Sequence, residues 1–323
     1  MSKIVAIAFS DIHIHNFRAF NDGNYNRLQE SLRALYEIGK FAIKKNVPLL
    51  FTGDLIHAPK EIENPTMTGL LVVLKKLFKH KNFRLIAISG NHDFFTRNTP
   101  HESSPSYLDG LSKVFKRFYH LNNSWYYGPE EKRVCVYGIP YYDNDKHTQE
   151  AIRKVNPDDR HFNILMLHSD FPGAKTPEGT KVGEVEQISA KMLKRWDLVI
   201  MGHIHMPQRL AKNVWMLGPP IHQDRSSIGQ RFGFWVIYDN GEMVFRCLND
   251  EFPCFIPEGK KAKEIDYIVP KEEDAQLTEQ EAEDKTFHVA ASSDKLTKRY
   301  LRKKGIKSKK KRRALIKILN EVR

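Results

Sequence analysis

The chain has 323 residues, of which 41% are hydrophobic and 28% charged, and its formal net charge is +13. This length and composition suit a globular protein with a sizeable buried core and exclude collagen-like, mucin-like and wholly disordered chains. No apolar run approaches the roughly eighteen residues of a membrane span, Asp11 comes too early for a signal peptide, and three cysteines, Cys135, Cys247 and Cys254, give no disulfide framework. We therefore expect a reduced, cytoplasmic protein with no membrane segment.

Short apolar runs alternate with helical patterns along the first two thirds of the chain. The spacing of apolar residues predicts helices over 26–45 and 70–78. Buried strands are expected at 4–9, 48–52, 84–89, 134–137, 163–167 and 198–201. After residue 206 the helical patterns stop, and strands are expected at 214–217, 232–238 and 243–248. This order predicts an α/β fold of layered sheets rather than a barrel.

Five of these strands end directly at clusters of Asp, Asn or His. The clusters are Ser10-Asp11-Ile12-His13, Gly53-Asp54-Leu55-Ile56-His57, Gly90-Asn91-His92-Asp93, His168 and Gly202-His203-Ile204-His205. Because the carboxyl ends of neighbouring strands face one crevice in an open α/β sheet, these side chains can converge although they are distant in sequence.

Local geometry and ligand chemistry support such a convergence. The alternation in Asp11-x-His13 and in His203-x-His205 places each pair on one side of the chain if the backbone is extended. The glycines that open three of the clusters permit sharp exits from the strands. Imidazole, carboxylate and amide oxygen without any thiolate suit ions such as manganese, iron or zinc.

The blocks SDIHIH, TGDLIH, SGNHD, LMLHSD and MGHIH, in this order, resemble the calcineurin-like metallophosphoesterase superfamily, and the resemblance covers residues 3–248. It implies an α/β fold, a four-layer α-β-β-α sandwich with a short C-terminal extension. It also implies two divalent metal ions that together activate water for attack on a phosphate ester. Manganese is the first choice for these ions, with magnesium, iron or zinc as alternatives.

The resemblance assigns a role to each residue of the blocks. One ion is expected on Asp11, His13 and His205, the other on Asn91, His168 and His203, with Asp54 bridging both. His92 would be the catalytic histidine, stabilising the transition state or protonating the leaving oxygen. Asp93 would support His92, and either Asp93 or a backbone carbonyl would fix its tautomer.

The second block bears on the substrate. Protein phosphatases of the superfamily carry G-D-x-V-D-R-G there, whereas this chain has Gly53-Asp54-Leu55-Ile56-His57-Ala58-Pro59 and lacks the arginine. A histidine three residues after the bridging Asp resembles the recombination nucleases related to bacterial SbcD, which work with an SbcC-type ATPase on DNA ends. Phe17–Asn21, Gly202–Gln208 and the segment LGPPIHQDRSSIGQRFGFWVI favour the same branch. His57 would then position the scissile phosphate; the alternative is a structural histidine that caps the loop.

Charge divides the chain into three parts. Residues 1–269 hold 36 Lys or Arg against 30 Asp or Glu, residues 270–285 hold 2 against 7, and residues 286–323 hold 14 against 2. We expect a nuclease domain over 1–250, a reduced cap remnant with an acidic linker over 251–285, and a basic, helical tail over 286–323. Only 75 residues follow residue 248, fewer than a full DNA-gating cap and ATPase-binding segment need, which suits a virus-encoded member of the branch.

The tail has two interpretations. An apolar strip of Ala314, Leu315, Ile318, Leu319 and Val322 within the basic segment indicates a helix that docks on a partner while its cations meet phosphates. The partner would be DNA together with the coiled coil of an SbcC-type ATPase. A solvated, disordered tail is the alternative.

These observations predict a two-metal DNA exonuclease or endonuclease, the nuclease subunit of an SbcC–SbcD-like complex acting in DNA recombination, repair or replication. A homodimer is compatible with that role. One alternative is a small-molecule phosphodiesterase or nucleotide phosphatase, since the fold and the metals do not fix the substrate. Another is a scaffold with a dead site that binds only DNA or a partner.

Overall fold

The computed structural model describes residues 2–16, 26–58, 62–94, 105–128, 134–183, 188–223 and 230–248. The chain divides into two compact units, Met1–Lys271 and Glu272–Arg323, and every described residue belongs to the first. The expected cap remnant, linker and tail lie outside the described residues, as do residues 17–21 and 224–229 of the quoted family segments. Within the described part, no helix combines the length and apolarity needed to cross a membrane.

The first of two six-stranded sheets has the order β12-β11-β1-β2-β3-β4, in which β1 to β4 run parallel, β11 runs antiparallel to β1, and β12 runs antiparallel to β11. Its strands are β1 (Ile4–Phe9), β2 (Leu49–Phe51), β3 (Leu85–Ala87), β4 (Phe118–His120), β11 (Gly233–Tyr238) and β12 (Met243–Cys247).

The second sheet has the order β5-β6-β7-β8-β10-β9, with a parallel centre and an antiparallel strand at each edge. Its strands are β5 (Ser124–Tyr127), β6 (Val134–Ile139), β7 (Phe162–His168), β8 (Leu198–Gly202), β9 (Gln208–Ala211) and β10 (Val214–Met216).

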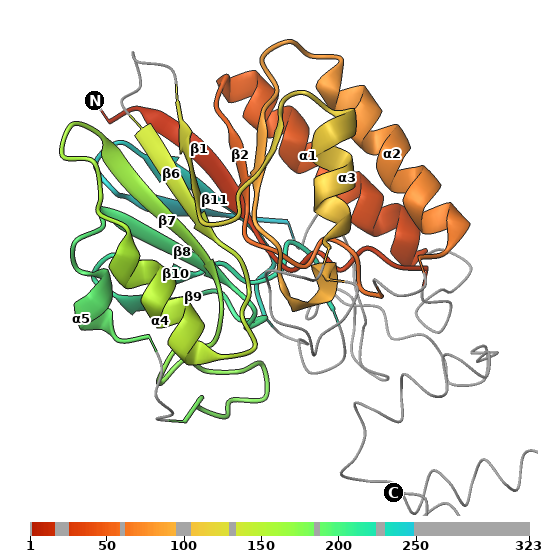
Figure 1. Ribbon diagram of the computed structural model, residues 1–323. Helices are drawn as coiled ribbons and strands as arrows, with labels where there is room; N and C mark the ends of the chain where they lie inside the picture. Colours follow the sequence, from red (N-terminus) through yellow and green to blue (C-terminus); the bar gives the residue numbers. More distant parts are fainter. Residues whose placement is uncertain are drawn as a thin grey trace, which may run out of the picture. The chain divides into compact units, whose positions relative to one another are not determined.

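The two sheets face each other, and helices cover their outer sides (Figure 1). The first sheet is covered by α1 (Arg27–Lys45), α2 (Asn64–Phe78) and α3 (Tyr107–Val114), and the second by α4 (Asp145–Lys154) and α5 (Ala190–Leu193). Alternation along β1 shows the layering, because Ile7 and Phe9 pack in the core under the helices whereas Ala6 and Ala8 pack between the sheets. The predicted four-layer sandwich is confirmed.

Most expected elements are present, with small shifts at their ends. Helix α1 begins one residue after its cap, Asn26, whose side chain accepts from the amide of Gln29 at 3.1 Å, and it ends at Asn46 in a left-handed conformation. Helix α2 starts earlier than the sequence indicated, at Asn64, with Pro65 in its first turn. Six elements were not predicted from the sequence: α3, α4, α5, β4, β5 and β9.

The register of the parallel strands aligns the ends that carry the polar clusters. Phe9 pairs with Phe51, and Phe51 with Ala87, so β1, β2 and β3 finish at one level of the first sheet. In the second sheet His168 pairs with Gly202, the last residues of β7 and β8. The five clusters therefore leave the two sheets at the same edge of the sandwich.

Candidate metal centre

The loops after β1 and β2 stay paired beyond the strands. The amide of Asp11 donates to the carbonyl of Gly53 at 3.0 Å, and the amide of His13 donates to the carbonyl of Asp54 at 3.0 Å. The chain then forms an isolated parallel bridge between Ile14 and Ile56. Because the two loops run side by side, the side chains of Asp11, His13 and Asp54 reach one region.

Their backbone is not extended. The φ angles are 50° at Asp11, 44° at His13, 64° at Asp54 and 104° at His203. These four account for all but two of the described non-glycine residues with positive φ, and such conformations cost of order 1–3 kcal/mol each. The expectation that an extended backbone aligns Asp11 with His13 and His203 with His205 is therefore wrong, and left-handed turns bring the side chains together instead.

One cluster contains Asp11, His13 and His205, whose potential ligand atoms lie within 4.8 Å of one another. The Nε2 atoms of His13 and His205 are 3.1 Å apart, and His205 Nε2 lies 3.9 Å from Asp11 Oδ1. Oδ2 of Asp11 is buried without a hydrogen-bond partner. A buried carboxylate oxygen with no donor is costly, and a cation bound beside the two imidazoles would compensate for it.

A second cluster surrounds the carboxamide of Asn91. Its Oδ1 lies 3.0 Å from His168 Nε2 and 3.0 Å from His203 Nδ1. His168 Nδ1 lies 2.7 Å from the carbonyl of Thr52, which can only accept, so this contact directs Nε2 of His168 toward the cluster.

Asp54 lies between the two clusters. Its Oδ2 is 3.4 Å from His13 Nε2 and 3.4 Å from His168 Nε2, while its Oδ1 accepts from the amide of His92 at 2.8 Å. One oxygen thus faces a histidine of each cluster. This is the position that a bridging carboxylate needs, and it supports the predicted role of Asp54.

Burial and neighbouring charges shift the pKa values of three histidines of the centre in opposite directions. Burial by itself lowers the pKa of His168, but the charges of Asp54 and Asp11 raise that pKa to about 9. Burial also lowers the pKa of His203, which with the charge of His168 falls to about 3, and burial holds the pKa of His13 well below its usual range. His13 and His203 are therefore neutral imidazoles near pH 7, the form that binds metals.

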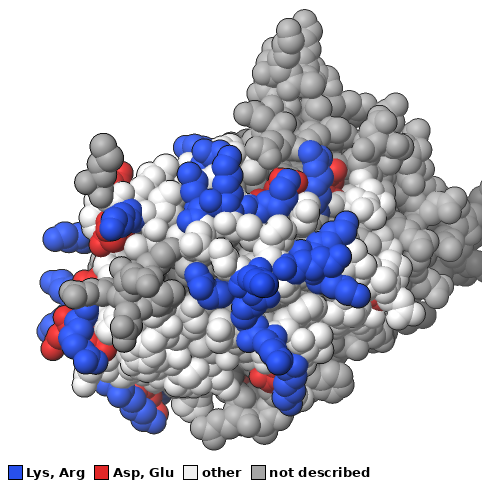
Figure 2. Space-filling view, turned by 90° about the horizontal axis from the view of Figure 1, so that it is seen from above, with Lys and Arg blue, Asp and Glu red and all other residues white. Residues whose placement is uncertain are grey.

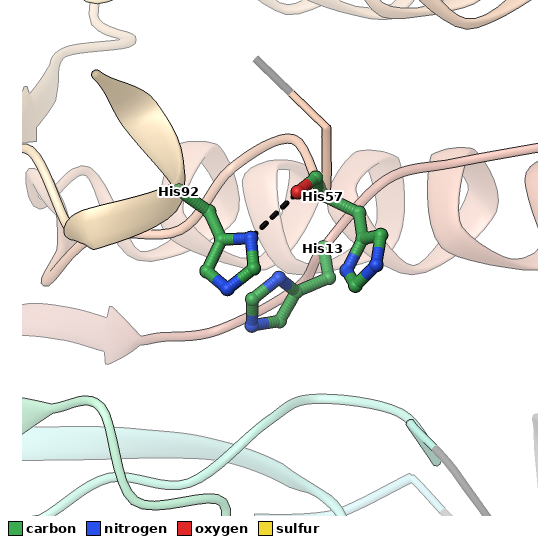
Figure 3. Close-up of side chains that lie close together, drawn as sticks. All are labelled: His13, His57 and His92. Carbon is green, nitrogen blue, oxygen red and sulfur yellow. Dashed lines mark hydrogen bonds between the residues drawn. The ribbon is translucent and has the colours of Figure 1, made fainter. Parts of the chain in front are cut away.

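His92 and His57 lie beside the first cluster (Figure 3). The Nδ1 atom of His92 lies 2.6 Å from the backbone carbonyl of His57, so Nδ1 carries the proton and donates. The rings of His57 and His92 stack with centroids 5.1 Å apart, and both approach His13, at 5.5 and 4.7 Å. Of the two expected means of fixing the tautomer of His92, the structure shows the backbone carbonyl.

Asp93 connects two loops of the centre. Its carboxylate accepts from the amides of Asp54, Leu55 and Gly90 at 2.7–2.9 Å, and Tyr107 donates its hydroxyl proton to the same carboxylate. These contacts tie the loop after β3 to the loop after β2. Asp93 is therefore a positioning residue for the loop that carries Asp54, and its expected support of His92 stays a prediction.

Two residues that the sequence reading missed hold the first loop in place. The side-chain amide of Gln223 donates to the carbonyls of Asp11 at 3.0 Å, Ile12 at 3.3 Å and Ile221 at 3.1 Å. Its Oε1 accepts from the buried guanidinium of Arg27 at 2.8 Å. Gln223 stands in the segment Leu217–Ile237 quoted for the resemblance, but no local pattern marks either residue as a partner of the first loop, because the contacts join positions more than 190 residues apart.

Glycine is required where the clusters crowd together. A Cβ at position 90 would lie 2.6 Å from His168 Cε1 and would overlap Asp54 Oδ1. A Cβ at position 202 would lie 2.6 Å from the carbonyl oxygen of Thr52. Only at Gly53, with φ of 104°, is left-handed freedom also needed. The sequence predicted that Gly90 and Gly202 permit sharp turns. The structure shows instead that glycine is needed there because neighbouring atoms leave no room for a side chain.

The residues present fit a pair of divalent ions. Each cluster offers imidazole nitrogens with at least one carboxylate or amide oxygen, and Asp54 serves both. Such a donor set suits manganese, iron or zinc. The ligand roles of Asp11, His13, Asp54, Asn91, His168, His203 and His205 stay predictions.

Comparison with known proteins gives a family. A family model described as calcineurin-like phosphoesterase matches residues 4–207. No curated protein matches the chain. One similar solved structure is a protein of Thermus thermophilus, 13% identical, with 76% of this chain and 99% of that chain covered and a TM-score of 0.45. Another is a dimetal phosphatase from Danio rerio, 10% identical, with 76% of this chain and 96% of that chain covered and a TM-score of 0.45. Structural similarity at TM-scores this low gives no information on activity.

Proposed function

Since the chain belongs to the calcineurin-like phosphoesterases, which hydrolyse phosphoester bonds with metal ions, we propose that it is a two-metal phosphodiesterase whose substrate is DNA. Manganese is the proposed metal. The observation that carries the choice of a diester is the second block, in which Ala58 stands where the phosphatases have their arginine and His57, one residue earlier, stacks on His92. A phosphodiester bears one negative charge and a phosphomonoester up to two, so a histidine is a sufficient partner for the former.

When bound, the two ions would polarise the phosphate and supply activated water. His13, His205 and Asp11 would hold one ion, and His168, His203 and Asn91 the other, with Asp54 between them. With Nδ1 of His92 donating to the carbonyl of His57, proton transfer to the leaving oxygen falls to Nε2. His57 would orient the phosphate from the side of the ring stack.

Substrate tests separate the proposal from its alternatives. With Mn²⁺, we expect the protein to cut linear duplex DNA and bis-p-nitrophenyl phosphate, and to cut p-nitrophenyl phosphate poorly. Cleavage of the small diester without DNA cleavage would indicate a small-molecule phosphodiesterase, and preference for the monoester a phosphatase. Two bound Mn²⁺ ions with no turnover on any substrate would indicate a scaffold.

We also propose that residues 286–323 bind the coiled coil of an SbcC-type ATPase. The support is their sequence alone, an apolar strip within a segment of 14 Lys or Arg against 2 Asp or Glu. Truncation after Asp284 should leave hydrolysis of bis-p-nitrophenyl phosphate unchanged and abolish capture of the ATPase. Leu315→Asp with Ile318→Asp should do the same while keeping the basic residues. Full ATPase affinity in the truncated protein would exclude this role.

A further inference from the structure

Basic residues gather at one end of the described unit. The stretches Lys40–Lys45, Lys75–Arg84 and Lys113–Arg117 hold three, five and three Lys or Arg residues and no Asp or Glu. Residues 1–269 as a whole are nearly balanced, with 36 cationic against 30 acidic residues. The three stretches therefore represent a segregation of charge rather than the average composition of the domain.

The fold places these stretches together. Helices α1 and α2 pack side by side and both finish at the end of the sandwich where the parallel strands begin (Figure 1). The view onto this end shows Lys and Arg side chains spread over it and few Asp or Glu (Figure 2). We call the surface formed by these three stretches the basic face.

Contacts between its members show that the basic face is continuous. Lys40 of α1 and Lys76 of α2 both lie over the ring of Tyr36, with Nζ 5.4 and 5.9 Å from its centroid. Lys45 of the basic face and Arg246 of the neighbouring strand β12 likewise lie over the ring of Phe41, at 5.7 and 5.0 Å. Two aromatic rings thus each bring together cations from two separate elements.

The turn after α2 is held in a fixed conformation. Arg117 donates through its guanidinium to the carbonyl of Phe78 at 2.6 Å and also to the carbonyl of Lys81. It thereby links the last carbonyl of α2 to a carbonyl of the turn that follows the helix. Lys79 and Lys81 are exposed on this turn, so their ammonium groups project from a fixed backbone.

We propose that the basic face binds the phosphate backbone of a DNA duplex, at a segment other than the one being cut. The proposal rests on the proposed function in taking DNA as the polyanion. The metal centre lies at the carboxyl ends of the parallel strands and the basic face at their amino ends, so one short, straight duplex segment does not serve both. Flexible lysines contact phosphates without reading sequence, so the expected binding is salt-dependent and sequence-independent.

The test uses the full chain with Lys75, Lys76, Lys79 and Lys81 all changed to Gln. Binding of a fluorescein-labelled duplex is followed by anisotropy without metal, over a salt series. We expect affinity to fall about tenfold or more at low salt, and the slope of log K against log salt to become shallower by about 2–4, because each lost phosphate contact contributes about 0.9. Turnover of bis-p-nitrophenyl phosphate should not change.

A matched control removes four exposed lysines from the second sheet's helices and their ends, Lys146, Lys154, Lys191 and Lys194, also to Gln. Its salt slope should stay near that of the wild type, and the contribution of the basic tail is the same in both variants. Changing the first four lysines to Arg should retain both affinity and slope. Equal thermal unfolding of all variants checks folding.

Three outcomes would overturn the proposal. These are an unchanged slope in the first variant, an equal loss in the control, or a loss confined to phosphatidylserine vesicles, which would identify a membrane surface instead. The proposed nuclease activity is tested separately. If the wild type does not cut DNA but the variant still loses DNA binding, the nuclease proposal is wrong and the basic-face proposal holds. If the wild type cuts DNA but the variant binds DNA as well as the wild type, the basic-face proposal is wrong and the nuclease proposal holds.

Discussion

The first sheet presents Asp11, His13 and Asp54 on loops with left-handed backbone, whereas the second sheet presents His168 from the last residue of a strand. The loops of the first sheet are held by hydrogen bonds to their backbone, from Gln223 to the loop after β1 and from Asp93 to the loop after β2. His168 needs only the regular ladder of β7 and β8 and one contact from its ring to Thr52.

The difference shows two ways of positioning a ligand. For His168 the direction of the side chain follows from the strand, so little beyond this residue itself should matter there. In the first sheet the backbone is strained, and its geometry depends on polar groups that contact no ion. Substitutions of supporting residues should therefore be costly around Asp11, His13 and Asp54 and mild around His168.

Asp54→Asn should have the largest effect, because this residue faces a histidine of each cluster. We expect loss of both ions, seen by titration calorimetry with Mn²⁺ as a stoichiometry that falls from two toward zero, and loss of turnover. Asp143→Asn, at an exposed position, is the control. Full stoichiometry in Asp54→Asn would show that the two sheets do not share this ligand.

His92→Asn should leave both ions and DNA affinity in place and slow the chemical step by about a hundredfold or more, the scale of a general acid. Single-turnover rates on duplex DNA measure this step directly. The exposed His147→Asn serves for comparison. If His92 only packs under the loop, the variant will be folded, loaded with metal and as fast as the wild type.

His205→Ala removes a predicted ligand that follows the second sheet and lies outside any strand. One Mn²⁺ site should weaken markedly while the other persists, and the free energy of unfolding of the metal-free protein should hardly change, since the side chain is a quarter exposed. Calorimetry and urea unfolding measure the two quantities. A large loss of metal-free stability would mean that the second sheet also relies on supporting contacts.

Gln223→Leu removes no ligand, yet it should destabilise the metal-free protein by about 1–3 kcal/mol, because buried carbonyls of Asp11 and Ile12 lose their donor. We expect a several-fold loss of Mn²⁺ affinity at the site of Asp11 and normal affinity at the other. Gln29→Leu, on the exposed side of α1, is the matched change. Two sites weakened equally would contradict a local role.

The layered fold could be predicted from two kinds of pattern. Short apolar runs that end at polar residues mark β1, β2, β3, β7 and β8, and apolar residues at helical spacing mark α1. The helices α3 and α4 were missed because their signals are weak. α3 is eight residues long and interrupted by Gly110, although Ser106 and Asp109 form a capping box at its start. β4 and β9 are three and four residues long, too short for a period to register.

The sequence predicted which side chains lie close together at the site, but not the backbone conformations and hydrogen bonds that hold them there. The position of a residue at a strand end can be predicted from the sequence. The blocks therefore predicted that Asp54 and both histidine clusters lie at one edge of the sheets. Left-handed φ at Asp11 and His13 was not visible, since non-glycine residues seldom adopt it. The carbonyl of His57 that holds His92, and Gln223 behind Asp11, depend on tertiary contacts for which no local pattern exists.

The pairing of β1 with β11 has a consequence for the order of folding during synthesis. Ile4 pairs with Tyr238, and the loop at Asp11 is completed only by Gln223, so the first strand leaves the ribosome long before its antiparallel neighbour exists. At ordinary translation rates this interval is roughly 10–50 s. Throughout it the nascent chain exposes one edge of β1 and an unsupported acidic loop. Metal loading should therefore be a late event, and nascent chains released before residue 233 should be targets for chaperones and proteases.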